Sequence, residues 1–334
     1  MAQLFVSVLF ATLQLFSFIA LGILIGKLKF WTKENLQALS RFLLTFALPA
    51  FLFSRIIKTD ISFLKKSLIF PLTALFSISL CLAIAYLIGG IFKIKSRERR
   101  TVTALSGFGN SGYLPLALIE ILPLSVPIVA DKFDPAVSAL YVGGFVLVFS
   151  PFFWSVGNYL ACGTKRKFRL KDFISPPFVG VSLAFLAILF GISPVLQNNR
   201  LPFYYILKAA ERLGDATFPL ALINLGAMIA MLEVSRSEAK GHLLYSLLPL
   251  FMRFIFLPSI FFLVFIFVLL PNKVEPAICW VLFLESITPP GTNFSIMAGR
   301  SGENTSTISI ALLTTYLSYI VIFPAALLLF LSFF

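Results

Sequence analysis

The sequence GFGNSGYLPLALIE, from Gly107 to Glu120, places a polar, glycine-rich patch beside a long apolar run. Three glycines, an asparagine, a serine and a proline lie within residues 107–115. The apolar residues that flank the patch are sufficient for one membrane span of about 20 residues. Because proline and glycine interrupt regular helices, we predict a transmembrane helix that is broken near its middle.

The composition indicates an integral membrane protein. The chain is 59% hydrophobic and 12% charged, with a mean hydropathy of +0.97, whereas a soluble domain has roughly 45–50% apolar and about 25% charged residues. The net charge is +13. Its basic residues occupy short segments between apolar runs, so we interpret them as cytoplasmic loops beside anionic lipids and not as a nucleic-acid surface.

The apolar runs predict an all-α protein with ten transmembrane helices. Their expected ranges are 4–26, 36–57, 67–92, 101–121, 136–161, 173–193, 213–233, 243–270, 275–298 and 304–332. The fourth and the ninth stand out because glycine, proline and asparagine cluster within a few residues and interrupt both, in GNSGYLP (109–115) and ITPPGTNFS (287–295).

The distribution of Lys and Arg predicts the orientation. Alternate loops, beginning with the first, hold 16 of these residues and the remaining loops hold 9. Because basic loops stay in the cytoplasm, we expect both termini outside, in the plasma (inner) membrane, or in the endoplasmic reticulum membrane if the protein is eukaryotic.

Internal similarity predicts an inverted repeat. The basic linker 164–172 separates a first five-helix repeat, residues 1–163, from a second, residues 173–334. An odd number of helices in each half makes the halves enter the membrane from opposite sides, as in many secondary transporters. The halves also match in detail: mid-helix prolines occur in the second and seventh helices, and the two breaks occupy equivalent fourth and ninth positions, where we expect the helices to cross at the midplane.

Paired breaks of this kind predict an anion site. A half-helix that begins inside the membrane presents free N–H groups and a partial positive charge, and two such starts can hold a carboxylate without a buried lysine. The candidate substrate-binding residues are Gly109, Asn110, Ser111, Gly112, Pro115, Pro289, Pro290, Gly291, Thr292 and Asn293. The alternative interpretation is that both segments are simple kinks, since Gly and Pro are common in membrane helices.

Several segments, taken together and in order, resemble the auxin efflux carrier family of membrane transporters. They are GFGNSGYLPLALIE (107–120), SPPFVGV (175–181), LGDATFPLALINLGAMIA (213–230), RFIFLP (253–258), PPGTNFSIMAGRSGE (289–303) and LLTTYLSYIVIFP (312–324). The short spacing from Asn110 to Pro115 is similar to the PIN-LIKES branch, and Pro290-Gly291-Thr292 replaces the more usual Ser/Thr-Ala-Val. The resemblance implies a scaffold and a moving transport domain, with alternating access for auxin-type indole acids, malonate or other carboxylates.

Two acidic residues are candidates for ion coupling. Glu285 lies one turn before Pro289 within an apolar run, where a carboxylate could bind a proton or a cation such as sodium. Its alternative role is a structural bond to a neighbouring helix. Asp215 opens the predicted seventh helix, where it could equally act as a cap. Arg41 and Arg253 could offset the charge of an anion, but both lie within two turns of a span end and could instead extend to the interface. We expect Glu120, at the outer end of the fourth helix, to face water.

The same sequence bears on two other functions, those of a membrane enzyme and of a channel or receptor. A membrane enzyme is disfavoured because no GxSxG or GxGD motif occurs, and the single histidine, His242, together with three scattered cysteines gives no metal site and no cofactor site. A channel or a membrane receptor for a small molecule stays open as the alternative to a carrier. A homodimer is also left open.

Overall fold

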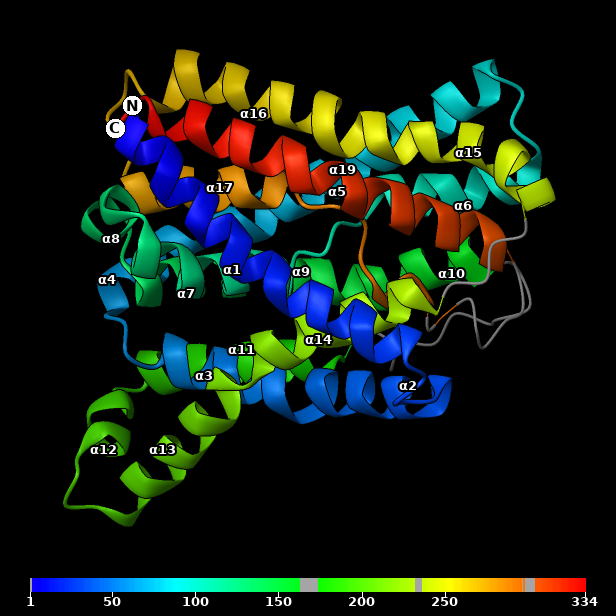
Figure 1. Cartoon of the computed structure of the whole chain (residues 1–334). Helices are drawn as coiled ribbons and strands as arrows, with labels where there is room; N and C mark the ends of the chain where they lie inside the picture. The colour runs from blue at the N-terminus through cyan, green and yellow to red at the C-terminus, as the bar shows by residue number, and fades with distance from the viewer. Residues whose placement is uncertain (1, 163–173, 232–235, 296, 298–303) are drawn as a thin grey trace.

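The computed structural model describes residues 2–162, 174–231, 236–295, 297 and 304–334. Every regular element within these ranges is a helix. The basic linker 164–172 lies outside the described residues. In Figure 1 the chain passes back and forth along one bundle, with both termini at the same end.

The helices of the first half are α1 (Ala2–Lys27), α2 (Lys33–Phe42), η1 (Leu43–Ala47), α3 (Leu48–Ile56), α4 (Ile61–Ser67), α5 (Ile69–Ile91), α6 (Ser96–Gly107), α7 (Leu114–Ser125), α8 (Pro127–Lys132), α9 (Pro135–Phe152), η2 (Phe153–Gly157) and α10 (Asn158–Cys162). The second half has α11 (Pro176–Leu189), α12 (Ser193–Gln197), α13 (Pro202–Asp215), α14 (Thr217–Ala230), α15 (Arg236–Phe251), η4 (Met252–Phe256), α16 (Leu257–Val264), η5 (Phe265–Leu269), α17 (Pro276–Ser286) and α19 (Thr305–Leu331).

Seven helices or helix runs among the described residues are long and apolar enough to cross a membrane: Gln3–Lys27, Lys33–Ile56, Ile61–Ile91, Pro135–Ala161, Pro202–Ala230, Leu243–Leu269 and Thr305–Leu331. The apolar helices α7, α11 and α17 are shorter. Two of the short helices, α7 and α17, belong to the interrupted fourth and ninth spans, where the backbone leaves the helix after Gly107 and after Ser286. The predicted interruption of both segments is confirmed.

One predicted boundary is wrong. The seventh span was expected to open at Gly214 and Asp215, but it begins at Pro202 with α13, and Asp215 ends that helix instead of capping the next one. The charged residues of α13 hid this start, because they lower the local hydropathy. They are paired in the fold: Glu211 forms ion pairs with Lys58 at 3.0 Å and with Lys208 at 2.8 Å.

We divide the helices into two groups for description. In the first, α1 packs on α14, and α3 packs on α11 and α13, with α2 beside α14; the second holds α5, α6, α7, α9, α10, α15, α16, α17 and α19. We call them the α1–α14 group and the crossover group. Contacts also cross between the groups, because α9 packs on α3 and α11, and α1 packs on α7 and α19. Small residues bring helices of the first group together: a Cβ on Gly22 would lie 2.0 Å from the carbonyl oxygen of Ile223, and one on Gly226 2.0 Å from that of Ile19. This is the small-residue contact by which membrane helices approach closely.

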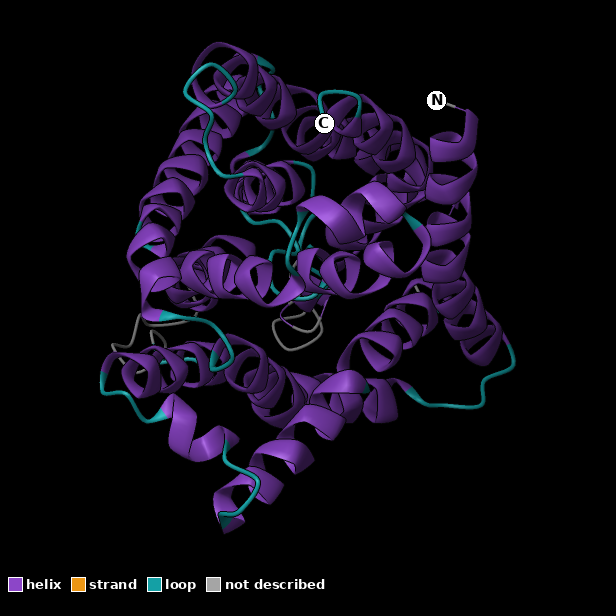
Figure 2. Cartoon of the chain, turned by 90° about the vertical axis from the view of Figure 1, so that its left-hand side faces the viewer, coloured by secondary structure: helices purple, strands orange, loops and turns teal. Residues whose placement is uncertain are grey.

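The crossover group encloses the two helix breaks. Seen along the bundle in Figure 2, loop segments lie among the helices in the interior. Buried aromatic side chains surround them, and Phe108 packs edge-on against Phe149 and Phe153 with ring centroids 6.0 and 5.8 Å apart. Non-helical backbone is tolerated at membrane depth only inside protein or against water, and this group supplies that enclosure.

Candidate substrate site at the helix breaks

The two breaks contact each other through their backbones. Gly109 and Pro290 form an isolated antiparallel bridge. The Asn110 N–H donates to the Pro289 carbonyl at 2.7 Å, and the Gly291 N–H donates to the Phe108 carbonyl at 3.1 Å. Segments 180 residues apart in the sequence therefore satisfy each other's backbone groups in the interior. The sequence predicted that the two segments occupy equivalent places in the two halves, in the fourth and ninth spans. The structure shows that they are in contact.

A tyrosine that the sequence analysis did not select joins the two breaks from a third helix. The side-chain amide of Asn110 donates to the hydroxyl of Tyr316 on α19 at 2.8 Å, and that hydroxyl donates to the Pro290 carbonyl at 3.2 Å. Tyr316 is buried. The available signal was a tyrosine inside the polar run TTY of an otherwise apolar span, since a buried tyrosine hydroxyl usually has a partner.

Both breaks end with the start of a helix. After the first, α7 begins at Leu114 without a side-chain cap. After the second, the N–H of Phe294 donates to Gly291 at 3.2 Å and that of Ser295 to Thr292 at 3.0 Å, which forms a helical turn. Within the described residues, no backbone hydrogen bond uses the N–H groups of Ser111, Gly112, Tyr113, Thr292 or Asn293. Both breaks thus leave donors free, as the start of a helix does.

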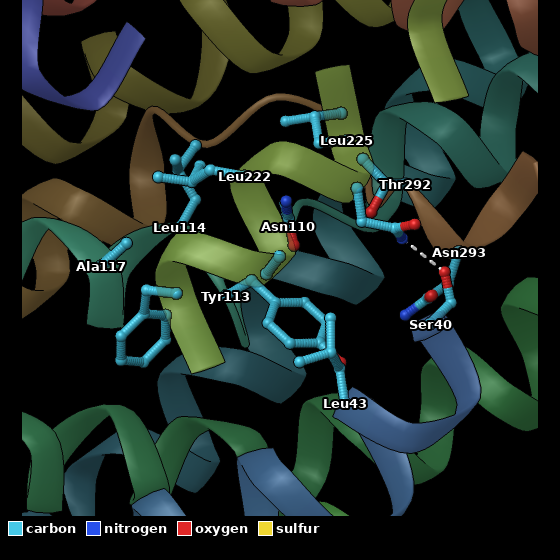
Figure 3. Close-up of a pocket in the computed structure, with 13 residues that line it drawn as sticks. Ser40, Leu43, Asn110, Tyr113, Leu114, Ala117, Leu222, Leu225, Thr292 and Asn293 are labelled. Carbon is cyan, nitrogen blue, oxygen red and sulfur yellow. Dashed lines mark hydrogen bonds between the residues drawn. The ribbon is translucent and has the colours of Figure 1, made fainter. Parts of the chain in front are cut away.

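Two cavities border these free donors, and we call them the interface cavities because they lie between the breaks and the α1–α14 group. The first has a free volume of about 20 Å³, room for about one water molecule, is drawn in Figure 3 and is lined by Ser40, Leu43, Asn110, Tyr113, Leu114, Ala117, Phe218, Ala221, Leu222, Asn224, Leu225, Thr292 and Asn293. The second has a free volume of about 30 Å³ and is lined by Leu44, Leu48, Gly109, Asn110, Ser111, Gly112, Tyr113, Val146, Phe149, Ser150, Phe153, Trp154, Pro177, Gly291 and Asn293.

The interface cavities have polar groups from both helix groups. Figure 3 shows Asn110, Thr292 and Asn293 near Ser40 of α2. Ser40 accepts a hydrogen bond of 2.6 Å from the side-chain amide of Asn224 on α14. A molecule in this space would touch the crossover group on one side and the α1–α14 group on the other.

Most, but not all, of the predicted site residues line the interface cavities. Seven of them line the interface cavities: Gly109, Asn110, Ser111, Gly112, Gly291, Thr292 and Asn293. The three prolines do not. Pro115 is buried in the first turn of α7, while Pro289 and Pro290 supply the carbonyls that receive hydrogen bonds from Asn110 and Tyr316. Their part in the site is to shape the backbone.

Glu285 lies on the opposite side of the breaks. It lines a third cavity of about 220 Å³, which we call the rear cavity, together with Thr73, Phe76, Ser77, Ile78, Gly107, Gly109, Ser111, Phe145, Phe149, Arg253, Leu257, Ile260, Phe261, Val264, Leu269, Leu282 and Ser286. Its carboxylate is buried and neither oxygen accepts a hydrogen bond from a described residue.

Three charged residues lie where the sequence did not place them. Glu120 does not simply face water, because Arg55 of α3 binds it with two hydrogen bonds of 3.0 Å. Arg55 also pairs with Asp215 at 3.0 Å. Asp215 lines none of the three cavities at the breaks. This ion network joins the ends of α3 and α13 to the middle of α7, and so joins the two helix groups.

The two intramembrane arginines, Arg41 and Arg253, differ in their exposure and in their hydrogen-bond partners. Arg41 is exposed and donates to the carbonyl of Gln37 on its own helix. Arg253 does not extend to the interface, which was one of its two expected roles: it is only 3% exposed and donates to the second break. Hydropathy alone could not separate the two, since both lie near the end of an apolar run.

A polytopic helical protein with two interrupted spans that meet in its interior has the architecture of a membrane transporter. The model of a family described as "Membrane transport protein" matches residues 7–154 and 161–327. The chain therefore belongs to this membrane transport family, that of the auxin efflux carriers, and is a transporter and not an enzyme.

Two relatives agree with this family. A protein of Rhizobium meliloti named "Putative malonate transporter" is 26% identical over 244 residues, which cover 68% of each chain. An "uncharacterized transporter" of Methanocaldococcus jannaschii is 28% identical over 237 residues, which cover 68% of this chain and 69% of the relative.

Proposed function

We propose that the protein is a carrier that moves a small organic anion across the membrane by alternating access. The observation that supports this most directly is the set of free backbone donors at both helix starts, beside the interface cavities, whose free volumes in this conformation are about 20 and 30 Å³ and would increase when the transporter opens to admit a substrate. Successive N–H groups at a helix start form an anion-binding concavity. A carboxylate would accept from Ser111, Gly112 or Tyr113 on one side and from Thr292 or Asn293 on the other.

The same proposal includes the topology. Ten membrane crossings would be arranged as a 5+5 inverted repeat, residues 1–163 and 173–334, with the fourth and ninth spans crossing at the midplane. The crossover group would be the moving transport domain and the α1–α14 group the scaffold. Both termini would lie outside the plasma membrane, with the basic loops against anionic lipids. A homodimer through the scaffold would be compatible with this arrangement.

The substrate class follows from the walls of the interface cavities. Tyr113, Phe149, Phe153 and Trp154 give an apolar lining around the donors, which suits an indole acid or another carboxylate with a compact apolar body. The relative named as a malonate transporter supports a short dicarboxylate as the first compound to test.

Binding of carboxylates and their neutral analogues to the purified protein tests the proposal. Malonate and indole-3-acetate should raise the thermal unfolding temperature, whereas malonamide and the methyl esters should not. If the neutral analogues bind as well as the acids, or if no carboxylate binds, the anion site is refuted. Counterflow of labelled malonate into loaded proteoliposomes then separates a carrier, which shows it, from a channel or receptor, which does not.

Two substitutions connect this binding to the breaks. Hydrogen bonds to charged groups contribute about 1.5–3 kcal/mol, and each 1.4 kcal/mol is tenfold in affinity, so Asn110→Ala and Asn293→Ala should each weaken binding by roughly tenfold to a hundredfold. The double variant should lose less than the sum, because both residues would bind one ligand. Asn198→Ala is the matched control, since Asn198 is exposed in the loop after α12.

A further inference from the structure

The guanidinium of Arg253 lies behind the crossing of the two breaks and contacts both of them. Arg253 belongs to η4, a π-helical segment between α15 and α16. Its Nε donates to the Thr288 carbonyl at 2.7 Å, and one terminal nitrogen donates to the Glu285 carbonyl at 3.1 Å and to the Thr288 hydroxyl. A Cβ on Gly109 would lie 2.1 Å from that same nitrogen. The guanidinium therefore packs directly on the first break while it bonds to the second.

The charge of Arg253 is balanced by backbone and not by an ion pair. Within the described residues Arg253 forms no salt bridge: it donates to the main-chain oxygen of Glu285, whose carboxylate oxygens accept no hydrogen bond. A buried charge without compensation is very costly. The compensation here comes from the carbonyl end of α17, whose last residue is Ser286. The carbonyl end of α6 borders the same rear cavity, since Gly107 lines it.

The four helix ends at the breaks sort by sign. The C-terminal ends of α6 and α17, with partial negative charge, border the rear cavity, where Arg253 lies. The start of α7 and the helical turn after Thr292, with partial positive charge, border the interface cavities. A fixed cation on the rear side offsets the negative ends, which would otherwise oppose an anion bound at the positive ends nearby.

We propose that Arg253 is a positioning residue: a tethered cation that holds the two breaks against each other and thereby sets the potential and geometry of the anion site in front of them. Carbonyl ends of broken helices are the groups that coordinate inorganic cations in other secondary transporters. Here the guanidinium occupies those carbonyls, so anion binding should be the same in sodium, potassium and choline chloride. The part that concerns the anion rests on the proposed function above.

Chemical rescue tests this role. Arg253→Ala leaves the Thr288 and Glu285 carbonyls beside an empty space the size of a guanidinium, and Arg253→Lys keeps the charge with fewer donors. Malonate affinity should fall about tenfold or more in Arg253→Ala and less in Arg253→Lys. Millimolar methylguanidinium should restore affinity to Arg253→Ala, whereas the same concentration of choline should not. Arg41→Ala, which removes an exposed arginine of another membrane span, should leave affinity unchanged with or without methylguanidinium.

The outcomes separate this inference from the proposed function. Unchanged malonate affinity in Arg253→Ala, or a loss that methylguanidinium does not reverse in folded protein, overturns the role of Arg253 while the anion site stands. If the wild type binds no carboxylate, the proposed function fails. The role of Arg253 in holding the breaks together is then tested by the unfolding temperature measured without any anion. Methylguanidinium should raise the unfolding temperature of Arg253→Ala and leave that of the wild type unchanged. Equal effects on both proteins would refute that role.

Discussion

Two tyrosines on one helix provide a sharp test of how the breaks are held together. Tyr316 and Tyr319 lie one turn apart on α19, and both are buried. The hydroxyl of Tyr316 accepts from Asn110 at 2.8 Å and donates to Pro290 at 3.2 Å. The hydroxyl of Tyr319 has no hydrogen-bond partner among the described residues. Replacing each by phenylalanine removes one oxygen from the same helix in the same surroundings.

The expected effects have opposite signs. Tyr316→Phe loses two hydrogen bonds at about 0.5–1.5 kcal/mol each, so it should destabilise by about 1–3 kcal/mol. Tyr319→Phe removes a buried hydroxyl whose lack of a partner costs about 1–3 kcal/mol, so it should be neutral or stabilising. Because the unfolding entropy is about 2.1 cal/mol/K per residue, a chain of 334 residues changes its unfolding temperature by about 1–2 °C for each kcal/mol, so the unfolding temperatures of the two variants should differ by at least about 1 °C.

The assay is thermal unfolding of purified protein in detergent, followed by tryptophan fluorescence. Asn110→Ala combined with Tyr316→Phe should destabilise less than the sum of the single changes, since both remove the same hydrogen bond. If Tyr319→Phe is as destabilising as Tyr316→Phe, the contact between Asn110, Tyr316 and Pro290 does not stabilise the crossing and the reasoning fails.

Four further results are expected. A cysteine placed at Thr164 should react with a membrane-impermeant reagent only from the cytoplasmic side of intact cells, because the loops of its set hold 16 Lys and Arg against 9 in the others; labelling from outside would reverse the orientation. Glu285→Gln should flatten the pH dependence of net malonate uptake while exchange persists, since Glu285 is a buried carboxylate without a hydrogen-bond partner in the described chain; an unchanged pH profile would make it structural. Glu120→Gln should lower stability by less than about 1 kcal/mol, because the pair with Arg55 is partly exposed, and a larger loss by thermal unfolding would contradict that estimate. Gly226→Leu should prevent assembly, since a Cβ at this position already overlaps the backbone of α1, whereas Gly191→Ala, with no atoms near its Cβ but a positive φ, should cost only modest stability; monodispersity in detergent distinguishes the two.

The π-helical segments show where prediction from the sequence stopped. Leu43 of η1, Phe153 and Trp154 of η2 and Arg253 of η4 all line cavities at the breaks. Prolines lie nearby: Pro49 follows η1, Pro151 precedes η2 and Pro258 follows η4. The prolines predict local irregularity of the helix backbone, because each removes one N–H donor from the hydrogen bonds along its helix. Which side chain each widened turn would direct toward the cavities depends on neighbouring helices.

The sequence by itself determined the class of protein and the positions of both breaks. Hydropathy over about 20 residues is a local property, as is the helix-breaking effect of Gly109, Pro115 or Pro289, so both can be read without knowing the fold. The proposed equivalence of the fourth and ninth spans rests on their places in the two predicted halves.

Only the tertiary structure decided which groups meet at the breaks. Gly109 bonds across to Pro290, Tyr316 joins them from α19, and Arg253 packs behind them while Glu285 lies apart from Asn110 and Asn293. These contacts join residues far apart in the sequence, and each depends on the crossing and rotation of whole helices. An apolar helix is hydrophobic around its whole circumference, so many rotations about its own axis would bury it equally well. Which polar side chains meet therefore depends on the packing of the neighbouring helices and cannot be read from one span alone.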